Sequence, residues 1–239
     1  MKKSRNKRWY NGSMKVTVFG ANKADIEPLV VSMGFDIVDS NPDFVITYGG
    51  DGTLVRSEEA FPGIPKIALR DSAVCKKCSR VSNEEVLTAI KNNAYKTEQL
   101  MKLSATAQGK TIIGMNDIIV HNADPRRGIR YTLAVNDTVI NQQIIGDGVV
   151  IATPFGSTGY YRSITDSYFE IGIGIAFNNS TEQADHIVIK EDSTVQFILT
   201  RGPAVVYADN TDENIELVEG DVVEIRKAGT TATIVTLNT

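Results

Sequence analysis

The sequence predicts an α/β N-terminal lobe with a parallel sheet, followed by a β-rich, β-sandwich-like C-terminal lobe. Before about residue 97, short apolar runs alternate with helical patterns, which is typical of a parallel sheet covered by helices. After that point strand-like runs follow one another, separated by turn residues, which favours two packed sheets. We therefore expect a disordered basic tail at residues 1–13, an α/β lobe at 14–97 and a β-rich lobe at 98–239.

The elements of the first lobe follow from local patterns. Strand-like runs lie at residues 14–20, 35–38, 43–48 and 65–69. Between the first two runs, Asp25 is expected to cap a helix, with Pro28 tolerated in its first turn. Ser82 and Glu85 form a capping box before a second helix, in which Val86, Leu87 and Ile90 share one face.

The second lobe consists mainly of predicted strands. The runs lie at residues 111–121, 130–135, 149–153, 171–177, 187–189, 195–199, 204–207, 222–225 and 232–237. Turn signals at residues 136–137, 146–148 and 219–221 separate several of them.

Composition excludes some classes of protein. The net charge of -4 over 239 residues argues against a general nucleic-acid binder. No apolar run approaches the roughly 20 residues of a membrane span, and no signal-peptide pattern opens the chain. We therefore expect a cytoplasmic protein with no nucleic-acid or membrane partner.

Cys75 and Cys78 are the only cysteines. A redox pair or half of a zinc site would suit their spacing, but a zinc site needs two more ligands. The only histidines, His121 and His186, lie far away in the sequence. We expect two free thiols in a loop and no resident metal.

The loop Gly49-Gly50-Asp51-Gly52-Thr53 follows the strand at 43–48 and enters a predicted helix. Open α/β sheets bind ligands where a strand ends in this way. Glycines let the backbone approach phosphate oxygens, the amides at a helix start donate to them, and Thr53 adds a hydroxyl. The loop therefore predicts a phosphate site.

Asp51 is unusual in such a loop, because a carboxylate repels phosphate. A kinase that phosphorylates an alcohol needs a carboxylate to accept the hydroxyl proton and orient the nucleophile. Mg²⁺ bound with the nucleotide would offset the charge. The alternative is a glycine-rich turn in which Asp51 only caps the helix.

The loop resembles the GGDGT motif that NAD kinases share with diacylglycerol and sphingosine kinases and, in related form, with phosphofructokinases. Two later pieces, Asn116-Asp117 and the block from Gly146-Asp147-Gly148 to Tyr160, match NAD kinases in order and spacing. The chain thus resembles the NAD kinase family over residues 14–60 and 110–165.

The resemblance implies transfer of phosphate from ATP or polyphosphate to the 2′-hydroxyl of the adenosine ribose of NAD, with Mg²⁺, in a homodimer or homotetramer. It implies that Asp51 is the base and that Gly49, Gly50, Gly52 and Thr53 hold phosphate. It also implies an NAD site formed by Asn116, Asp117, Asp147, Thr158, Gly159, Tyr160, Ser163 and Asp209.

In that site, Asn116 would present a donor and an acceptor to the adenine edge. Asp117 would accept from ribose or from the adenine amine. Asp147 would bond a ribose or the nicotinamide amide, and in the family the equivalent residue acts across a subunit interface. Ser157 and Thr158 would offer hydroxyls at a helix start, and Tyr160 a ring to stack.

Some positions depart from the family pattern. Arg70-Asp71 stands where the family has small, apolar residues, Phe155 replaces Ser or Thr, and Gly159 replaces Ala. Residues 163–170 lack the Gly-Gly-Pro segment that contacts the phosphate donor. Two alternatives therefore stay open: a GGDGT kinase of another alcohol, such as a lipid or sugar, and a non-catalytic nucleotide-binding paralogue.

Overall fold

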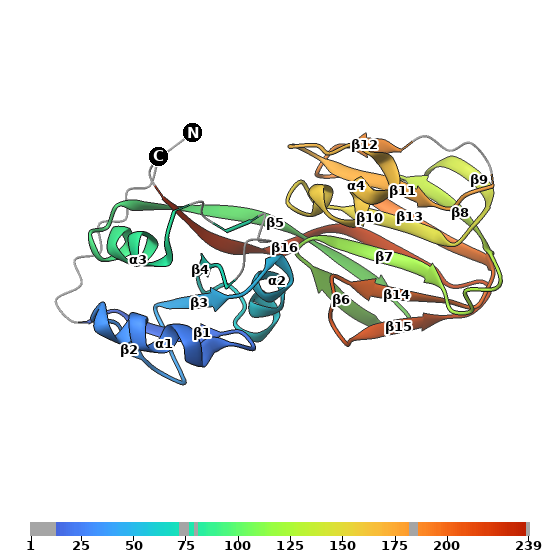
Figure 1. Cartoon of the computed structure of the whole chain (residues 1–239). Coiled ribbons are helices and arrows are strands. Elements are labelled where there is room, and N and C mark those ends of the chain that lie inside the picture. Colours follow the sequence, from blue (N-terminus) through green and yellow to red (C-terminus); the bar gives the residue numbers. More distant parts are fainter. Residues whose placement is uncertain (1–12, 72–76, 79–80, 182–185, 238–239) are drawn as a thin grey trace. The chain divides into compact units, whose positions relative to one another are not determined.

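The computed structural model describes residues 13–71, 77–78, 81–181 and 186–237. The predicted tail, apart from Ser13, and Cys75 lie outside these residues. The chain divides into two compact units, one formed by Met1–Glu98 with Thr233–Thr239 and the other by Gln99–Ala232. The first is α/β and the second β-rich (Figure 1), which confirms the predicted fold class.

The first unit is built on a parallel sheet. Its strands are β1 (Lys15–Phe19), β2 (Asp36–Ile37), β3 (Phe44–Tyr48) and β4 (Lys66–Leu69), in the order β2-β1-β3-β4. The last strand of the chain, β16 (Val222–Leu237), joins this sheet next to β4, where Ile234 pairs in parallel with Lys66. The closing residues 233–239 therefore belong to this unit, although the sequence pattern placed them in the β-rich lobe.

Three helices accompany this sheet: α1 (Lys23–Ser32), α2 (Asp51–Ala60) and α3 (Asn83–Lys91). Helices α1 and α3 bury apolar side chains in one core with β1, β3 and β4. The predicted capping box is confirmed, because Ser82 Oγ accepts the Glu85 N–H at 3.2 Å. The start of α1 differs from the prediction: the helix begins at Lys23, its N-cap residue Asn22 makes no side-chain bond, and Pro28 lies in the second turn.

The opposite face of β4 meets α2. Lys66 and Glu58 form an ion pair with side-chain exposures of only 1% and 4%. Lys66 Nζ also donates to the Phe61 carbonyl at 2.6 Å, and Glu58 accepts the Gly63 N–H at 3.1 Å. The pair therefore fixes the end of α2 against the sheet.

The second unit packs two sheets around one apolar core. One sheet has the order β12-β11-β10-β7-β14-β15, and the other contains β16, β13, β8 and β9, with β5 pairing β16 and β6. The strands are β5 (Tyr95–Ala107), β6 (Lys110–Gly114), β7 (Asp117–Asn122), β8 (Ile129–Val135), β9 (Thr138–Gly146), β10 (Gly148–Ala152), β11 (Ile173–Asn178), β12 (Ile187–Ile189), β13 (Thr194–Arg201), β14 (Ala204–Ala208) and β15 (Asn214–Leu217). A short 3₁₀ turn, η1 (Gly156–Thr158), and helix α4 (Tyr160–Thr165) follow β10.

Several strands differ from the predicted runs. The run at 111–121 is two strands, because Met115 and Asn116 turn between β6 and β7. The runs at 222–225 and 232–237 are one strand, β16, since its middle stays paired with neighbours. Strands β5, β9 and β15 were not predicted. None of the helices within the described residues has both the length and the apolar character needed to cross a bilayer.

Candidate functional site

The glycine loop lies where the sequence places it. Strand β3 ends at Tyr48, and α2 begins at Asp51 with Gly50 as its N-cap. A Cβ on Gly49 would lie 2.3 Å from Thr53 Oγ1, so only glycine fits there. A Cβ on Gly50 would meet no atom within 4 Å, so the space beside it is open. The N–H groups of Gly50 and Gly52 make no hydrogen bond within the described residues and can donate to an anion, whereas those of Thr53 and Leu54 donate to the Gly50 carbonyl at 3.0 and 3.3 Å.

Asp51 lies at the first position of α2 and is partly exposed. Its Oδ1 accepts the backbone N–H of Lys77 at 2.9 Å. Cys78 Sγ lies 3.6 Å from the Gly49 carbonyl oxygen. Cys78 is disulfide-bonded, so the expectation of a free thiol is wrong at this position. The carboxylate of Asp51, the predicted base, is therefore held by the backbone N–H of Lys77.

Arg70 follows β4 beside this loop. The Gly49 N–H donates to the carbonyl of Leu69 at 3.1 Å, so the two strand ends are adjacent. Asn83 binds the Arg70 backbone twice, accepting its N–H at 3.1 Å and donating to its carbonyl at 2.9 Å. Arg70, which departs from the family pattern, therefore has a backbone that Asn83 holds in place.

In the second unit, the turn at Met115 and Asn116 is held from two sides. The Asp209 carboxylate accepts the backbone N–H groups of Met115, Asn116 and Asp117 at 2.7, 2.6 and 3.0 Å. Thr153 donates its hydroxyl to the Met115 carbonyl and its N–H to the Asn116 carbonyl, both at 2.8 Å. The half-buried Asn116 amide makes no hydrogen bond within the described residues, so it can bind a ligand.

Asp117 is a buried carboxyl group with 5% exposure and no hydrogen bond to its side chain within the described residues. Burial, reinforced by the neighbouring Asp209 carboxylate, raises the pKa of Asp117 to about 7. The pKa of Asp209 is also raised by burial, although its three backbone N–H bonds act in the opposite direction. Asp117 can therefore carry a proton near neutral pH, when it is both donor and acceptor.

The segment after β10 approaches this turn closely. A Cβ on Gly156 would lie 2.0 Å from the Asn116 carbonyl oxygen, so glycine is required there. Ser157 is fully buried and its hydroxyl lies within hydrogen-bond distance of the Pro154 and Phe169 carbonyls, at 2.8 and 3.0 Å. Its hydroxyl is therefore structural, unlike the nucleotide contact that we expected. Thr158 is half-buried and keeps its hydroxyl without a partner within the described residues.

Helix α4 presents the remaining predicted residues of this segment. Gly159 and Ser163 are exposed, and the Ser163 hydroxyl donates to the Tyr160 carbonyl at 2.7 Å. The Tyr160 hydroxyl accepts from Asn178 Nδ2 at 2.8 Å. Burial raises the pKa of Tyr160, with smaller contributions from the charges of Asp147 and Asp117, so the phenol stays protonated and keeps a hydrogen to donate.

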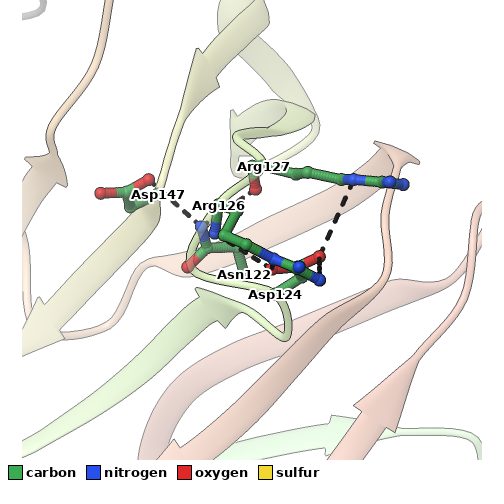
Figure 2. Close-up of polar contacts among 5 residues, drawn as sticks. All are labelled: Asn122, Asp124, Arg126, Arg127 and Asp147. Carbon is green, nitrogen blue, oxygen red and sulfur yellow. Dashed lines mark hydrogen bonds and ion pairs between the residues drawn. The ribbon is translucent and has the colours of Figure 1, made fainter.

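Asp147 lies in the turn between β9 and β10, where the ends of β7 and β11 meet it. Its two carboxylate oxygens accept from Asn122 Nδ2 at 3.2 Å and from Asn179 Nδ2 at 3.0 Å. Figure 2 shows the first of these bonds beside the turn that contains Arg126 and Arg127. Asn122, Asn178 and Asn179 were not predicted as site residues, because a lone asparagine near a turn looks in sequence like an ordinary turn residue.

The fold of this chain, an α/β unit and a two-sheet unit, is similar to the folds of two solved structures. The chain aligns with an NAD kinase from Archaeoglobus fulgidus, in complex with ATP, at a TM-score of 0.76 and 20% identity over 92% of this chain and 93% of that one. It aligns with a yeast NADH kinase complexed with NADH at a TM-score of 0.82 and 14% identity, over 96% and 85% of the two chains.

A family model of the ATP-NAD kinase C-terminal domain matches residues 115–237. The chain therefore belongs to the NAD kinase family. It is 32% identical over 165 residues to the NAD kinase of Sulfurisphaera tokodaii, covering 64% of this chain and 63% of that protein. It is 28% identical over 142 residues to an NAD kinase of Saccharolobus islandicus, covering 59% of this chain and only 56% of that relative, so the match spans little more than half of it.

Proposed function

We propose that the protein is an NAD kinase, which transfers phosphate from ATP or polyphosphate to the 2′-hydroxyl of the adenosine ribose of NAD. The observation that carries this proposal is the position of Asp51 within the glycine loop, at the first residue of α2, in a chain of the NAD kinase family. In this assignment residues 14–97 carry the phosphate loop, and residues 98–239 carry the NAD motifs.

The residues divide the chemistry between them. Asp51 accepts the proton of the attacking hydroxyl and orients it. Gly49, Gly50, Gly52 and Thr53 form the phosphate cradle. The Gly50 and Gly52 amides and the Thr53 hydroxyl donate to phosphate, while Gly49, whose N–H is bound to the Leu69 carbonyl, shapes the turn. Asn116, Asp117, Asp147, Thr158, Gly159, Tyr160 and Ser163 hold NAD. Asp209 acts indirectly, because its carboxylate is already engaged by the backbone of the Asn116 turn.

Mg²⁺ fits this loop as a partner of the nucleotide. The described residues contain no group of three or more His, Cys, Asp or Glu side chains that could hold a metal ion. Mg²⁺ in kinases is commonly bound by one or two carboxylates together with substrate phosphates, and Asp51 supplies one carboxylate. The ion would neutralise charge on the transferred phosphate. We further propose a cytoplasmic homodimer or homotetramer.

The test is formation of NADP from NAD, ATP and Mg²⁺ by the purified protein. Asp51→Asn is expected to lower the rate more than about a hundredfold while NAD still binds. Glu59→Gln, an exposed residue of the same helix, is the control and should leave the rate unchanged. Absence of NADP with both ATP and polyphosphate would refute the proposal.

The NAD motif has its own test in Asn116→Ala. The half-buried amide makes no bond within the described residues, so its removal should cost little stability. NAD affinity should fall by about 1–3 kcal/mol, because the adenine edge loses its hydrogen-bond partner. Calorimetric titration with NAD measures this, and an unchanged affinity would place the adenine elsewhere.

A further inference from the structure

The carboxylate of Asp147 is held in place by two asparagines. Each of its oxygens accepts one amide N–H, from Asn122 at 3.2 Å and from Asn179 at 3.0 Å. We propose that Asn122 and Asn179 are positioning residues, which fix the Asp147 carboxylate as a hydrogen-bond acceptor for an N–H or O–H group of NAD. This proposal rests on the NAD kinase function proposed above.

The Asn122 side chain leaves one buried polar atom without a hydrogen bond, which does not favour the stability of the fold. Its side chain is 6% exposed, and its Oδ1 is buried with no hydrogen-bond partner. Its Nδ2 donates both to Asp147 and to the Arg127 carbonyl, the latter at 3.0 Å. The amide cannot be turned over, because Oδ1 would then face two acceptors. A buried acceptor without a partner is unfavourable for folding. The hydrogen bond that Nδ2 donates to Asp147 accounts for an asparagine at this position.

The charge of Asp147 stays available to a ligand. Among the residues that the structure describes, no lysine, arginine or histidine forms an ion pair with it. The two nearby arginines are engaged by Asp124, at 2.8 Å from Arg126 and 3.8 Å from Arg127. Figure 2 shows the Arg127 guanidinium directed away from Asp147. Within the described part of the chain, the Asp147 carboxylate is therefore held by neutral amides alone.

The backbone of Asp147 is fixed as well. Its N–H donates to the Asn178 carbonyl at 3.0 Å, and its carbonyl accepts the Asn122 N–H at 2.8 Å. A carboxylate offers about four lone-pair directions, of which the two amides use two. The others can accept from a carboxamide or a hydroxyl, and NAD carries both groups. A site with so little freedom binds without first having to order its own side chains.

The experiment is a double-mutant cycle read by calorimetric titration with NAD. Asn179→Gly is the first variant, because Asn179 is exposed and has φ of 50°, which glycine adopts without strain. NAD affinity is expected to fall about tenfold in Asn179→Gly and also about tenfold in Asp147→Asn. In the Asp147→Asn background the same Asn179→Gly change should cost less than about twofold, since its effect passes through the carboxylate.

Asn93→Gly is the matched control. Asn93 is also exposed and has φ of 53°, but it lies after α3 in the other unit. Its NAD affinity should equal that of the wild type. Equal losses from Asn179→Gly in both backgrounds would show that Asn179 does not act through Asp147 and would overturn the proposal.

Asn122→Leu separates positioning from stability. An apolar side chain of similar size removes the unpartnered oxygen but also the two hydrogen bonds that Nδ2 donates. These effects on stability oppose each other, so the urea midpoint is expected to change little while NAD affinity falls about tenfold. A lower midpoint with unchanged NAD affinity would mean that Asn122 only supports the fold. If the wild-type protein binds no NAD, the proposed function itself fails, whereas NAD binding without coupling between residues 179 and 147 refutes only the positioning role.

Discussion

The Asp209 carboxylate accepts the backbone N–H of Asn116 at 2.6 Å, across 93 positions of the sequence. The same carboxylate takes the N–H groups of the two residues on either side of Asn116. One side chain from the end of β14 therefore sets the backbone of the turn that presents the Asn116 amide. Asp209 therefore fixes this part of the site through backbone hydrogen bonds.

We expect Asp209→Asn to weaken both the fold and NAD binding. The amide replaces one acceptor oxygen with a donor that faces backbone N–H groups, and it removes the charge that strengthens the remaining bonds. The free energy of unfolding should fall by about 2 kcal/mol or more. Urea denaturation measures this, with the exposed Asp212→Asn as control. An Asp209→Asn protein as stable as Asp212→Asn would show that the three bonds contribute nothing.

Stability should fall as pH rises toward neutrality. The pKa of Asp117 is about 7 in the folded protein against an ordinary value of 3.8, so the folded state holds a proton that the unfolded chain releases between those values. The free energy of unfolding therefore decreases across that window and is flat above it. Asp209, whose pKa is also raised, acts in the same direction. Asp117→Asn should show a smaller decrease between about pH 5 and pH 8, and equal slopes for the two proteins would contradict this.

Gly50→Ala should separate phosphate binding from folding. The added methyl group meets no protein atom within 4 Å and the backbone φ is -94°, which alanine adopts easily. The free energy of unfolding should change by less than about 1 kcal/mol. The methyl group would project into the space proposed for phosphate, so the rate of NADP formation should fall about tenfold to a hundredfold. Melting temperature and NADP formation measure the two effects. Full activity of Gly50→Ala would remove the main reason for placing phosphate at the loop.

Gly156→Ala is the contrasting variant, because its methyl group would lie 2.0 Å from the Asn116 carbonyl oxygen. It should lower stability by about 1–3 kcal/mol and NAD affinity together.

Lys66→Met should destabilise the protein by about 3–5 kcal/mol, because it leaves the buried Glu58 carboxylate without its cation. Replacing both residues, as Lys66→Met with Glu58→Leu, should recover part of that loss, since no buried charge remains. Chemical denaturation of the single and double variants is the measurement. A double variant less stable than Lys66→Met alone would show that the pair stabilises the fold beyond mutual neutralisation.

Local chemistry made part of the structure predictable. The loop at residues 49–53 and the capping box at Ser82 and Glu85 depend on neighbours a few positions away, and both lie where the sequence indicated. Strand β5 escaped prediction because its first half is polar and exposed, so it has no apolar alternation. Its extended form depends on pairing with β6, the next strand along the chain, and with β16, which is distant in sequence.

The site was predictable only as a list of residues facing a ligand. Asn116 appeared to continue a strand, because nothing near it in the sequence shows that Asp209 and Thr153 bend the backbone there. Asn122 and Asn179 gave no signal, since their partner Asp147 is 25 and 32 positions away. Contacts of this length are set by the packing of strands and cannot be read from a local pattern.

Strand β16 leaves the second unit and ends in the first, where Ile234 pairs with Lys66. The β-rich unit is therefore flanked in the sequence by segments of the α/β unit. During synthesis β4 cannot pair with β16 until the whole β-rich unit and Ile234 have been made. Stopping at Ala232, although it would spare every proposed ligand contact, would deprive the phosphate-loop unit of the strand that pairs with β4.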